Sequence, residues 1–345
     1  MNARRIVIHR SGSYDRLDVE HFDVPKPTAT EVIVEVRAAG VNYADCMVRM
    51  GLYSSAKEYV GWPITPGFEV AGVVTAAGNA VHDLEVGAEV IAVTLFGGYT
   101  SHLVVDRRHV FPKPAALSFP AAAGIPAVFM TAWFALFELA HPRPGGNILV
   151  HSAAGGVGGC LVQLGKLAGC NVTGVVGASH KVEVAQSYGA DHVIDKATAS
   201  LWQAAEKIAP DGFDVILDAN GVATLGDSYK HLRHAGKLVV YGFHTMIPRK
   251  GGRPNWLKLA RDWLATPRFN PLDMTTQSRS VLAFNLSYLF DRLDLLQLCM
   301  DDVFTWLEDR KIDAPGTTVY ALDDAAKAHR DIESAQTTGK LILVP

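Results

Sequence analysis

Hydrophobic and polar positions alternate in short runs along the first third of the chain. Runs of this kind, separated by turn residues, predict strands at Ile6–His9, Glu31–Ala38, Val70–Thr75, Glu89–Val93 and Thr100–Val105. We therefore expect a β-rich domain over residues 1–126.

From about residue 127 the pattern changes to apolar β-type runs that alternate with segments of helical spacing. The first predicted strand begins at Ile148. The others cover Asn171–Val176, His192–Ile194, Asp214–Asp218 and Lys237–Tyr241. The first predicted helix follows Gly158. The others cover Lys181–Tyr188, Leu201–Ile208 and Ala223–His234. This order predicts an α/β fold with a doubly wound parallel sheet that is covered by helices on both faces.

The alternation of strand and helix patterns is interrupted after Tyr241 by an insertion over residues 246–280. It contains a basic stretch, Arg249–Pro254, and an amphipathic segment, Asn255–Thr266. A strand at Ser280–Leu286, a helix at Leu289–Arg310 and a last strand within Gly339–Val344 complete the predicted elements.

A turn of small residues follows the first strand of the α/β region and opens a helix. Its residues are Ala153, at the place of a first glycine, then Gly155, Gly156, Val157 and Gly158. Such a turn directs unpaired backbone N–H groups at a pyrophosphate, which predicts a dinucleotide site. The alternative is that the small residues only allow a helix to pack closely on a strand.

Composition narrows the classes of function. The chain has 345 residues, 49% hydrophobic and 19% charged, and a net charge of −3, which offers no general attraction to nucleic acid. We find no run of about 18 apolar residues that suggests a membrane span, and no signal peptide, and expect a cytoplasmic protein. The four cysteines show no paired spacing typical of disulfides or structural zinc.

Four separated motifs resemble one protein family in residues and order. They are Ala39–Asp45, Thr65–Gly72, Val86–Val90 and His151–Gly158. Together they resemble the zinc-free quinone oxidoreductases of the medium-chain dehydrogenase/reductase superfamily. The insertion and the stretch Phe284–Leu289 are most similar to the vesicle amine transport protein homologues within it.

This resemblance implies a GroES-like catalytic domain made from residues 1–126 and 287–345. A Rossmann domain of residues 127–286 is inserted between these parts, with the active cleft between the two domains. Members of the family pair through the last strand of the Rossmann sheet, so a homodimer is expected.

The positions that carry metal ligands in zinc-dependent relatives hold other residue types here. They are Asn42, Phe68 and, by approximate alignment, Ala127, and none of these side chains is a zinc donor. Glu69 alone cannot hold the ion, and we expect it to be a structural carboxylate that pairs with a cation at the domain interface. We predict no metal, and therefore an acceptor that needs little polarisation, namely a quinone or an α,β-unsaturated carbonyl.

The cofactor prediction rests on the end of the second Rossmann strand. No carboxylate stands at Val176–Lys181 to accept the ribose hydroxyls, whereas Ser179 and Lys181 can donate to a 2′-phosphate. Lys196 stands where the resemblance implies a residue near the same phosphate, and is expected to add a second cation. These residues predict NADPH, unless the lysines are simply solvated surface charges.

The resemblance also implies roles for further residues. Asn42 would lie near the nicotinamide, Tyr53 would reach the substrate and Thr131 would contact the cofactor. Met47 replaces an aromatic hydroxyl of many relatives, which leaves the proton donor open between Tyr53 and water. Further cofactor contacts are expected at strand ends and closing loops, from Asn220, Tyr241, Gly242, Phe243, Asn285 and Lys340.

The amphipathic segment Asn255–Thr266 suggests a function of another class. Trp256 and Trp263 with nearby basic residues are typical of a helix that lies on a membrane surface, although a lid or dimer element is the stronger interpretation. The competing hypothesis is an NADPH-binding peripheral membrane or adaptor protein with little turnover. His151 and His244 near the cleft are expected to be structural rather than catalytic.

Overall fold

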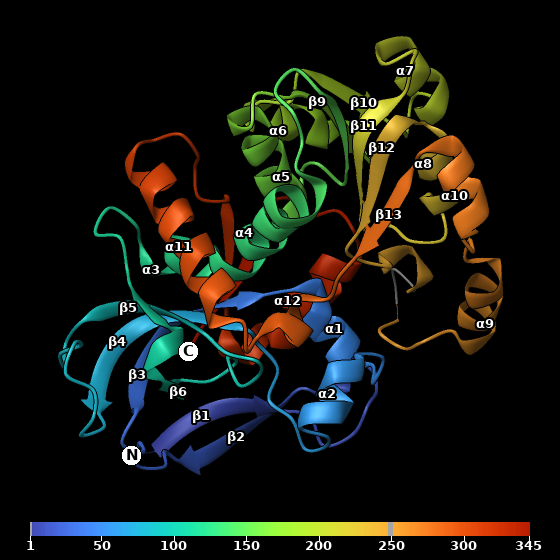
Figure 1. Ribbon diagram of the computed structural model, residues 1–345. Helices are drawn as coiled ribbons and strands as arrows, with labels where there is room; N and C mark the ends of the chain where they lie inside the picture. The colour runs from blue at the N-terminus through green and yellow to red at the C-terminus, as the bar shows by residue number, and fades with distance from the viewer. Residues whose placement is uncertain (1, 248–250) are drawn as a thin grey trace.

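Two large β-sheets, stacked one above the other in Figure 1, organise the protein. The computed structural model describes residues 2–247 and 251–345, so the first two residues of the predicted basic stretch, Arg249 and Lys250, lie outside the described part.

The upper sheet is formed by the middle of the chain. Its strands are β8 (Asn147–His151), β9 (Asn171–Val176), β10 (His192–Asp195), β11 (Phe213–Asp218), β12 (Leu232–Val240) and β13 (Ser280–Ala283). All pairs are parallel, in the order β10-β9-β8-β11-β12-β13. Ile148 and Val150 belong to one buried cluster and Leu149 to another, so both faces of the sheet are covered, as the apolar strands predict.

Short helices cross between these strands. They are α5 (Gly156–Leu167), α6 (Val182–Ser187), α7 (Leu201–Ile208) and α8 (Leu225–Lys230), with the 3₁₀ turns η4 (Ser179–Lys181) and η5 (His244–Met246). In Figure 1, α5 and α6 lie to one side of the strands and α7 and α8 to the other.

The lower sheet joins the two ends of the chain. Its strands are β3 (Glu31–Val41), β4 (Glu69–Ala77), β5 (Glu89–Val93), β6 (His102–Asp106), β7 (Val110–Pro112), β14 (Thr317–Ala321) and β15 (Lys340–Val344). β15 pairs antiparallel with β3, whereas β1 (Asn2–Val7) and β2 (Asp18–Asp23) form a separate pair. The predicted combination of a GroES-like β-rich part and a Rossmann part is confirmed.

Along the chain, helices and 3₁₀ turns lie between the strands of the lower sheet and between β1 and β2. They are η1 (Tyr14–Arg16), α1 (Tyr43–Arg49), α2 (Ser54–Tyr59), η2 (Arg107–His109), η7 (Leu322–Asp324) and α12 (Ala325–Glu333). The insertion and the segment after it form α9 (Trp256–Ala265), α10 (Pro271–Gln277), η6 (Leu286–Leu289) and α11 (Leu293–Glu308). In Figure 1, α9 and α10 project at the right of the molecule.

A long apolar helical segment connects the two sheets and corrects one expectation. α3 (Phe119–Ala123), α4 (Pro126–Trp133) and the π-helical η3 (Phe134–Ala140) together form a run of 22 residues that is long and apolar enough to cross a membrane. The expectation that no such run exists was wrong on length and composition. However, 61% of its apolar window is buried inside the protein, which is typical of a core helix.

Several predicted boundaries were also wrong. The first strand covers Asn2–Val7 rather than Ile6–His9. The predicted helix Ala223–His234 ends at Lys230, because β12 already begins at Leu232 and pairs with Phe213 of β11. The predicted strand Ser280–Leu286 ends at Ala283, because the Asn285 side chain caps η6. The last long helix begins at Leu293, after η6, rather than at Leu289.

Candidate functional site

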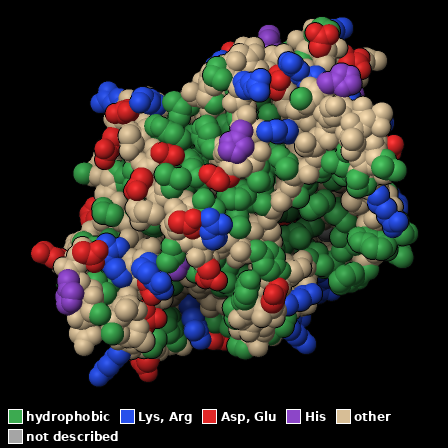
Figure 2. All heavy atoms as spheres, in the orientation of Figure 1, with side chains coloured by type: hydrophobic (Ala, Val, Ile, Leu, Met, Phe, Trp, Pro, Cys, Tyr) green, Lys and Arg blue, Asp and Glu red, His purple; other side chains and the backbone are tan. Residues whose placement is uncertain are grey.

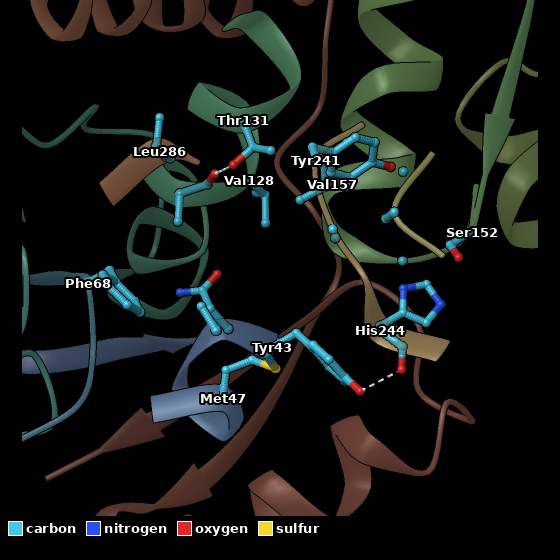
Figure 3. A pocket seen from close by; sticks show the side chains of 18 of the residues that line it. Tyr43, Met47, Phe68, Val128, Thr131, Ser152, Val157, Tyr241, His244 and Leu286 are labelled. Atoms are coloured by element: carbon cyan, nitrogen blue, oxygen red, sulfur yellow. Dashed lines mark hydrogen bonds between the residues drawn. The ribbon is translucent and has the colours of Figure 1, made fainter. Parts of the chain in front are cut away.

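A cavity of about 1060 Å³ lies between the two sheets, and residues from both of them line it. Figure 2 shows a hollow lined by hydrophobic side chains on the right of the molecule, beside the projecting helices α9 and α10. Figure 3 shows side chains entering a pocket from both parts, with Met47 and Phe68 on one side and Val157 and Tyr241 on the other. The size suits a cofactor together with a small substrate.

The glycine turn forms one wall of this cavity. α5 begins at Gly156, so the first N–H groups of the helix have no partner within the helix. A Cβ on Gly158 would lie 2.1 Å from the carbonyl oxygen of Ser152, and one on Gly156 would lie 2.9 Å from Val128. The glycines therefore serve both interpretations of the sequence: they allow close packing, and they leave the backbone open to a ligand.

Ala153 supports this turn on the side that faces away from the cavity. It is fully buried, and its Cβ lies 2.9 Å from the position that a Cβ on Gly174 would occupy. Its methyl group thus fills the space that Gly174 leaves in β9. Ala153 supports the turn and is not among the residues that line the cavity.

The three predicted phosphate-binding side chains already have partners in the protein. Lys181 Nζ donates to the carbonyl oxygens of Ala335 (2.9 Å) and Thr337 (2.7 Å), while Ser179 Oγ donates to Asp195 Oδ2 at 2.5 Å. Lys181 and Lys196 line the cavity, and Ser179 does not.

Asp195 was missed by the sequence analysis. The cofactor prediction rests on the end of β9 alone, but β10 lies beside β9 in parallel register and places Asp195 opposite Val176. A carboxylate therefore does stand near the predicted 2′-phosphate site, contrary to the expectation. The pKa of Asp195 is lowered by the hydrogen bond from Ser179.

The ends of β11 and β12 supply the next part of the wall. Tyr241, Gly242 and Phe243 line the cavity, whereas Asn220 is buried behind it, with its backbone N–H donating to Asp218 Oδ1 (2.7 Å). Asn220 supports the strand end rather than facing the cavity. Burial raises the pKa of the Tyr241 hydroxyl, which stays protonated at neutral pH.

The two histidines near the cleft are held by structural contacts. His151 is fully buried, with Nε2 3.1 Å from Ser228 Oγ. His244 lines the cavity and accepts a hydrogen bond at its backbone carbonyl from Tyr43 (3.1 Å; dashed in Figure 3). Burial lowers the pKa of both rings, that of His244 to about 4, so both are neutral at neutral pH.

A buried group of opposite charges stands at the base of the cavity. Lys340 Nζ lies 2.5 Å from Glu69 Oε1 and donates to Asn42 Oδ1 at 2.6 Å, and Asn42 Nδ2 donates to the same Glu69 oxygen at 3.0 Å. The second Glu69 oxygen accepts from the backbone N–H of Ala127 (2.7 Å). The side chains of Lys340 and Glu69 are 3% and 0% exposed, which makes each charge depend on the other.

Three of the four positions that were compared with metal ligands lie together in this group. They are Asn42, Glu69 and Ala127. The fourth, Phe68, packs in an aromatic cluster, 6.0 Å from the ring of Tyr53 and 5.3 Å from that of Phe96. An amide, a phenyl ring and a methyl group do not supply the donors that zinc prefers. The ammonium group of Lys340 instead supplies the positive charge beside Glu69.

Tyr53 and Asn285 approach the cavity from different parts of the chain. The Tyr53 hydroxyl donates to Asn285 Oδ1 at 3.0 Å, and the same oxygen accepts from the backbone N–H and the hydroxyl of Ser287 (3.1 and 2.9 Å). Burial raises the pKa of Tyr53, so its hydroxyl keeps its proton. Thr131 also lines the cavity, but its hydroxyl donates to Ala127 at 2.6 Å.

One buried group of potential metal ligands occurs among the residues that the structure describes. The ligand atoms of Cys46, His329 and Glu333 lie within 4.8 Å of one another. The Arg49 guanidinium forms a buried ion pair with Glu333, and burial raises the pKa of the Cys46 thiol. With a fixed cation present and a protonated thiol, this group joins α1 to α12 and does not suit a metal ion.

Most of the predicted site residues line the cavity. The predicted site residues that line the cavity are Asn42, Tyr53, Thr131, Gly155, Gly156, Val157, Gly158, Lys181, Lys196, Tyr241, Gly242, Phe243, Asn285 and Lys340. The three that do not are Ala153, Ser179 and Asn220. The structure agrees with the expectation that Glu69 pairs with a cation. That this cation is Lys340 had no signal in the sequence, because the two residues are distant along the chain.

Comparison with known proteins agrees with this architecture. Residues 28–115 match the alcohol dehydrogenase GroES-like domain, and residues 188–343 match the zinc-binding dehydrogenase family. The synaptic vesicle membrane protein VAT-1 homolog of Danio rerio is 34% identical over 99% of this chain and 69% of its own length. The chain belongs to the quinone oxidoreductase branch of the medium-chain dehydrogenase/reductase superfamily, near VAT-1.

Solved structures of similar fold include enzymes. The quinone oxidoreductase of Escherichia coli in complex with NADPH has a TM-score of 0.86 and 26% identity, covering 99% of this chain and 100% of that one. The CurK enoyl reductase has a TM-score of 0.84 and 27% identity, with 99% of each chain covered. The protein is therefore an oxidoreductase by family.

Proposed function

We propose that the protein is a metal-independent reductase that uses NADPH to transfer a hydride to a quinone or an α,β-unsaturated carbonyl. The observation that carries this proposal is the group at the base of the cavity. There, Lys340 and Asn42 accompany Glu69, and no set of zinc donors is present.

The class of acceptor follows from this donor set. Reduction of an isolated ketone concentrates negative charge on one oxygen, which a metal ion usually stabilises. A quinone or enone spreads the charge over a conjugated system, so that hydrogen bonds and a nearby cation suffice. The E. coli quinone oxidoreductase and the CurK enoyl reductase, both similar in fold, are named for such acceptors.

The residues at the glycine turn suit a dinucleotide. The N–H groups that begin α5 would hold the pyrophosphate. Because Gly158 has no side chain, the helix start can pack closely against the backbone of Ser152. Lys181 and Lys196 line the end of the cavity where a 2′-phosphate would bind. When bound, the cofactor supplies the hydride.

The protein residues orient the acceptor and stabilise its charge. Tyr53, which keeps its proton because burial raises its pKa, can donate a hydrogen bond to the developing oxyanion. Asn285 fixes the hydroxyl of Tyr53, and Lys340 adds positive charge at the base of the cavity. We propose Asn42 and Tyr53 as the side chains closest to the reaction.

The test of this function is turnover after removal of metals. The purified protein, treated with a strong chelator, should oxidise NADPH in the presence of quinones and enones at an unchanged rate, and should reduce isolated ketones poorly. Recovery of activity only after addition of zinc would contradict the proposal.

The cofactor preference has a separate test. Lys181→Glu should raise the KM for NADPH at least about tenfold, since a charge-assisted contact to phosphate is replaced by repulsion, and should change that for NADH little. Lys230→Glu is the matched control, because Lys230 is a surface lysine outside the cavity that pairs with Asp227. Equal effects of Lys181→Glu on both cofactors would remove this residue from the phosphate site.

A second candidate function is favoured by the surface of α9 and α10. Five large apolar side chains on these helices are 67–86% exposed: Trp256, Leu257, Trp263, Leu264 and Leu272. Exposed tryptophan and leucine side chains of this kind suit a membrane surface, and VAT-1 relatives are named as vesicle membrane proteins. The alternative is therefore an NADPH-binding protein of the membrane surface with little turnover.

Sedimentation with liposomes distinguishes the two functions. Binding that is lost in the variant Trp256→Ser/Trp263→Ser, without NADPH consumption across a panel of acceptors, would favour the alternative. Turnover without liposome binding would exclude it. For the enzyme we propose a cytoplasmic location, in keeping with four free and buried cysteines.

A further inference from the structure

We propose that the acceptor carries an apolar tail of several carbon atoms, and that this chain has a separate compartment for it. The tail chamber, as we name it, is the part of the cavity lined by Val93, Leu95, Met130, Phe290, Leu295 and Leu296. This inference deepens the proposed function and rests on it.

The walls of the tail chamber come from one strand of the lower sheet and from helical segments that follow it along the chain. Val93 ends β5, Met130 lies on α4, Phe290 follows η6, and Leu295 and Leu296 lie on α11. Val93 and Leu296 belong to one buried cluster, against which Met130 and Phe290 pack. The walls are therefore packed side chains in fixed positions, which suits a site that is already formed before its ligand binds.

Except for Arg292, the charged residues that line the described cavity belong to segments other than those of the tail chamber. Among the described lining residues, Lys181 and Lys196 are at the proposed phosphate end, and Lys258 lies on α9. Lys340 and Glu333 lie on β15 and α12. Arg292 precedes α11, with 56% of its side chain exposed and its guanidinium paired with Asp294.

A neutral cysteine completes the wall from α11. Cys299 lines the cavity, and burial raises the pKa of its thiol, so it contributes an uncharged surface. A charged or strongly polar tail would lose its hydration in the tail chamber and find no partner on these walls.

The order of residues along one short segment gives the acceptor a direction. Asn285, which accepts the hydrogen bond of Tyr53, stands just before η6, and Phe290 stands just after it. A molecule with its carbonyl at Tyr53 can therefore extend along η6 toward α11. A polar head near Tyr53 and an apolar tail beside Leu295 describe an amphiphilic enone or an alkyl-substituted quinone.

The experiment uses a homologous series of linear alkyl vinyl ketones with NADPH. Each methylene that enters the tail chamber should raise kcat/KM about threefold to fourfold, until the chamber is filled. Binding of saturated methyl ketones of the same lengths, measured by calorimetry on the NADPH-loaded protein, gives a second readout that needs no turnover.

Filling the tail chamber should remove this dependence. In Leu295→Trp, a half-buried side chain grows into the chamber, and kcat/KM for the longest ketone should fall at least about tenfold while that for methyl vinyl ketone changes less than about twofold. Leu298→Trp is the matched control on the same helix, since Leu298 is 49% exposed and does not line the cavity.

The outcomes separate this inference from the proposed function. If the short ketone is reduced but the rates and affinities do not change with length, the tail chamber is refuted and the reductase remains. Length dependence that persists in Leu295→Trp also refutes it. If no ketone is reduced, the reductase proposal fails, and length-dependent binding that Leu295→Trp abolishes still supports the tail chamber.

Discussion

Lys340 is the residue whose role depends most on the folded structure. Its ammonium group and the Glu69 carboxylate are both buried and lie 2.5 Å apart, although they come from opposite ends of the chain. The sequence shows that Asn42 and Phe68 are not zinc ligands, because this follows from residue type alone. It cannot show that Lys340 supplies the missing charge, because that contact exists only after β15 has paired with β3.

Removal of this cation should destabilise the protein strongly. Lys340→Met leaves the buried Glu69 carboxylate without its counter-charge, and the free energy of unfolding should fall by about 3–5 kcal/mol. Chemical denaturation followed by circular dichroism measures this change. The double variant Lys340→Met/Glu69→Gln should recover most of the loss, and a double variant as unstable as the single one would contradict the account.

Stability should also depend on pH through His244. Its pKa is lowered from 6.5 to about 4, first by burial and then by the charge of Lys196. Between these values the unfolded chain binds a proton that the folded protein does not, so the free energy of unfolding falls as pH falls from about 6.5 to 4. One such group contributes a slope of up to about 1.4 kcal/mol per pH unit.

Denaturation at a series of pH values measures this slope. His151 and His329, whose pKa values are also lowered by burial, add to it in the wild-type protein. His244→Asn should therefore reduce the proton uptake on unfolding by about one. An unchanged slope in His244→Asn would show that this ring is protonated in the folded state.

At the scale of elements, the hydrophobic periodicity predicted strands and helices correctly where the local sequence alone determines the secondary structure. The predicted helix Leu201–Ile208 and strand Glu89–Val93 are confirmed to the residue. Prediction was wrong where tertiary pairing decided, as at Leu232, where β12 begins early because it pairs with β11. The helices α1 and α2 were not predicted, since short helices in a β-rich region leave little periodic signal.

The connection from β8 to α5 provides a prediction at this scale. In Gly158→Ala, the added methyl carbon would stand 2.1 Å from the backbone oxygen of Ser152, so the turn must move. We expect NADPH affinity to fall at least about tenfold and the protein to lose about 1–3 kcal/mol of stability. Calorimetric titration and thermal unfolding measure the two effects.

Gly316→Ala is the control for this variant. A Cβ at Gly316 meets no atom within 4 Å, and the residue has no positive φ, so the change should be tolerated. Unaltered NADPH binding by Gly158→Ala would mean that the turn adapts, and that its backbone does not hold the pyrophosphate in the proposed way.

At the scale of the whole molecule, the cavity exists because both ends of the chain enter one sheet. β15 joins β3, and Gly339 next to it pairs with Gly155 of the glycine turn. Residues of the last strand are thus brought to the start of α5. The resemblance to a family predicted this arrangement, but composition and periodicity did not, since they carry no information on contacts between distant segments.

The upper sheet also predicts how two copies of the protein associate. β13 is the last strand of that sheet, and among the described strands it pairs only with β12. The backbone N–H of Phe284 points toward Val240 of β12, so by alternation that of Val281 points away from β12. An edge strand with outward N–H groups can pair with the same strand of a second copy, and the family resemblance implies such a homodimer.

Light scattering at micromolar concentration should therefore give a mass of twice 37.2 kDa. Val281→Pro removes an outward N–H group that the isolated subunit does not use, and proline is tolerated on an edge strand in this orientation. The variant should be a monomer with an unchanged circular dichroism spectrum, because only the contact between the two β13 strands is lost. A dimeric Val281→Pro variant, or a monomeric wild-type protein, would place the association elsewhere or exclude it.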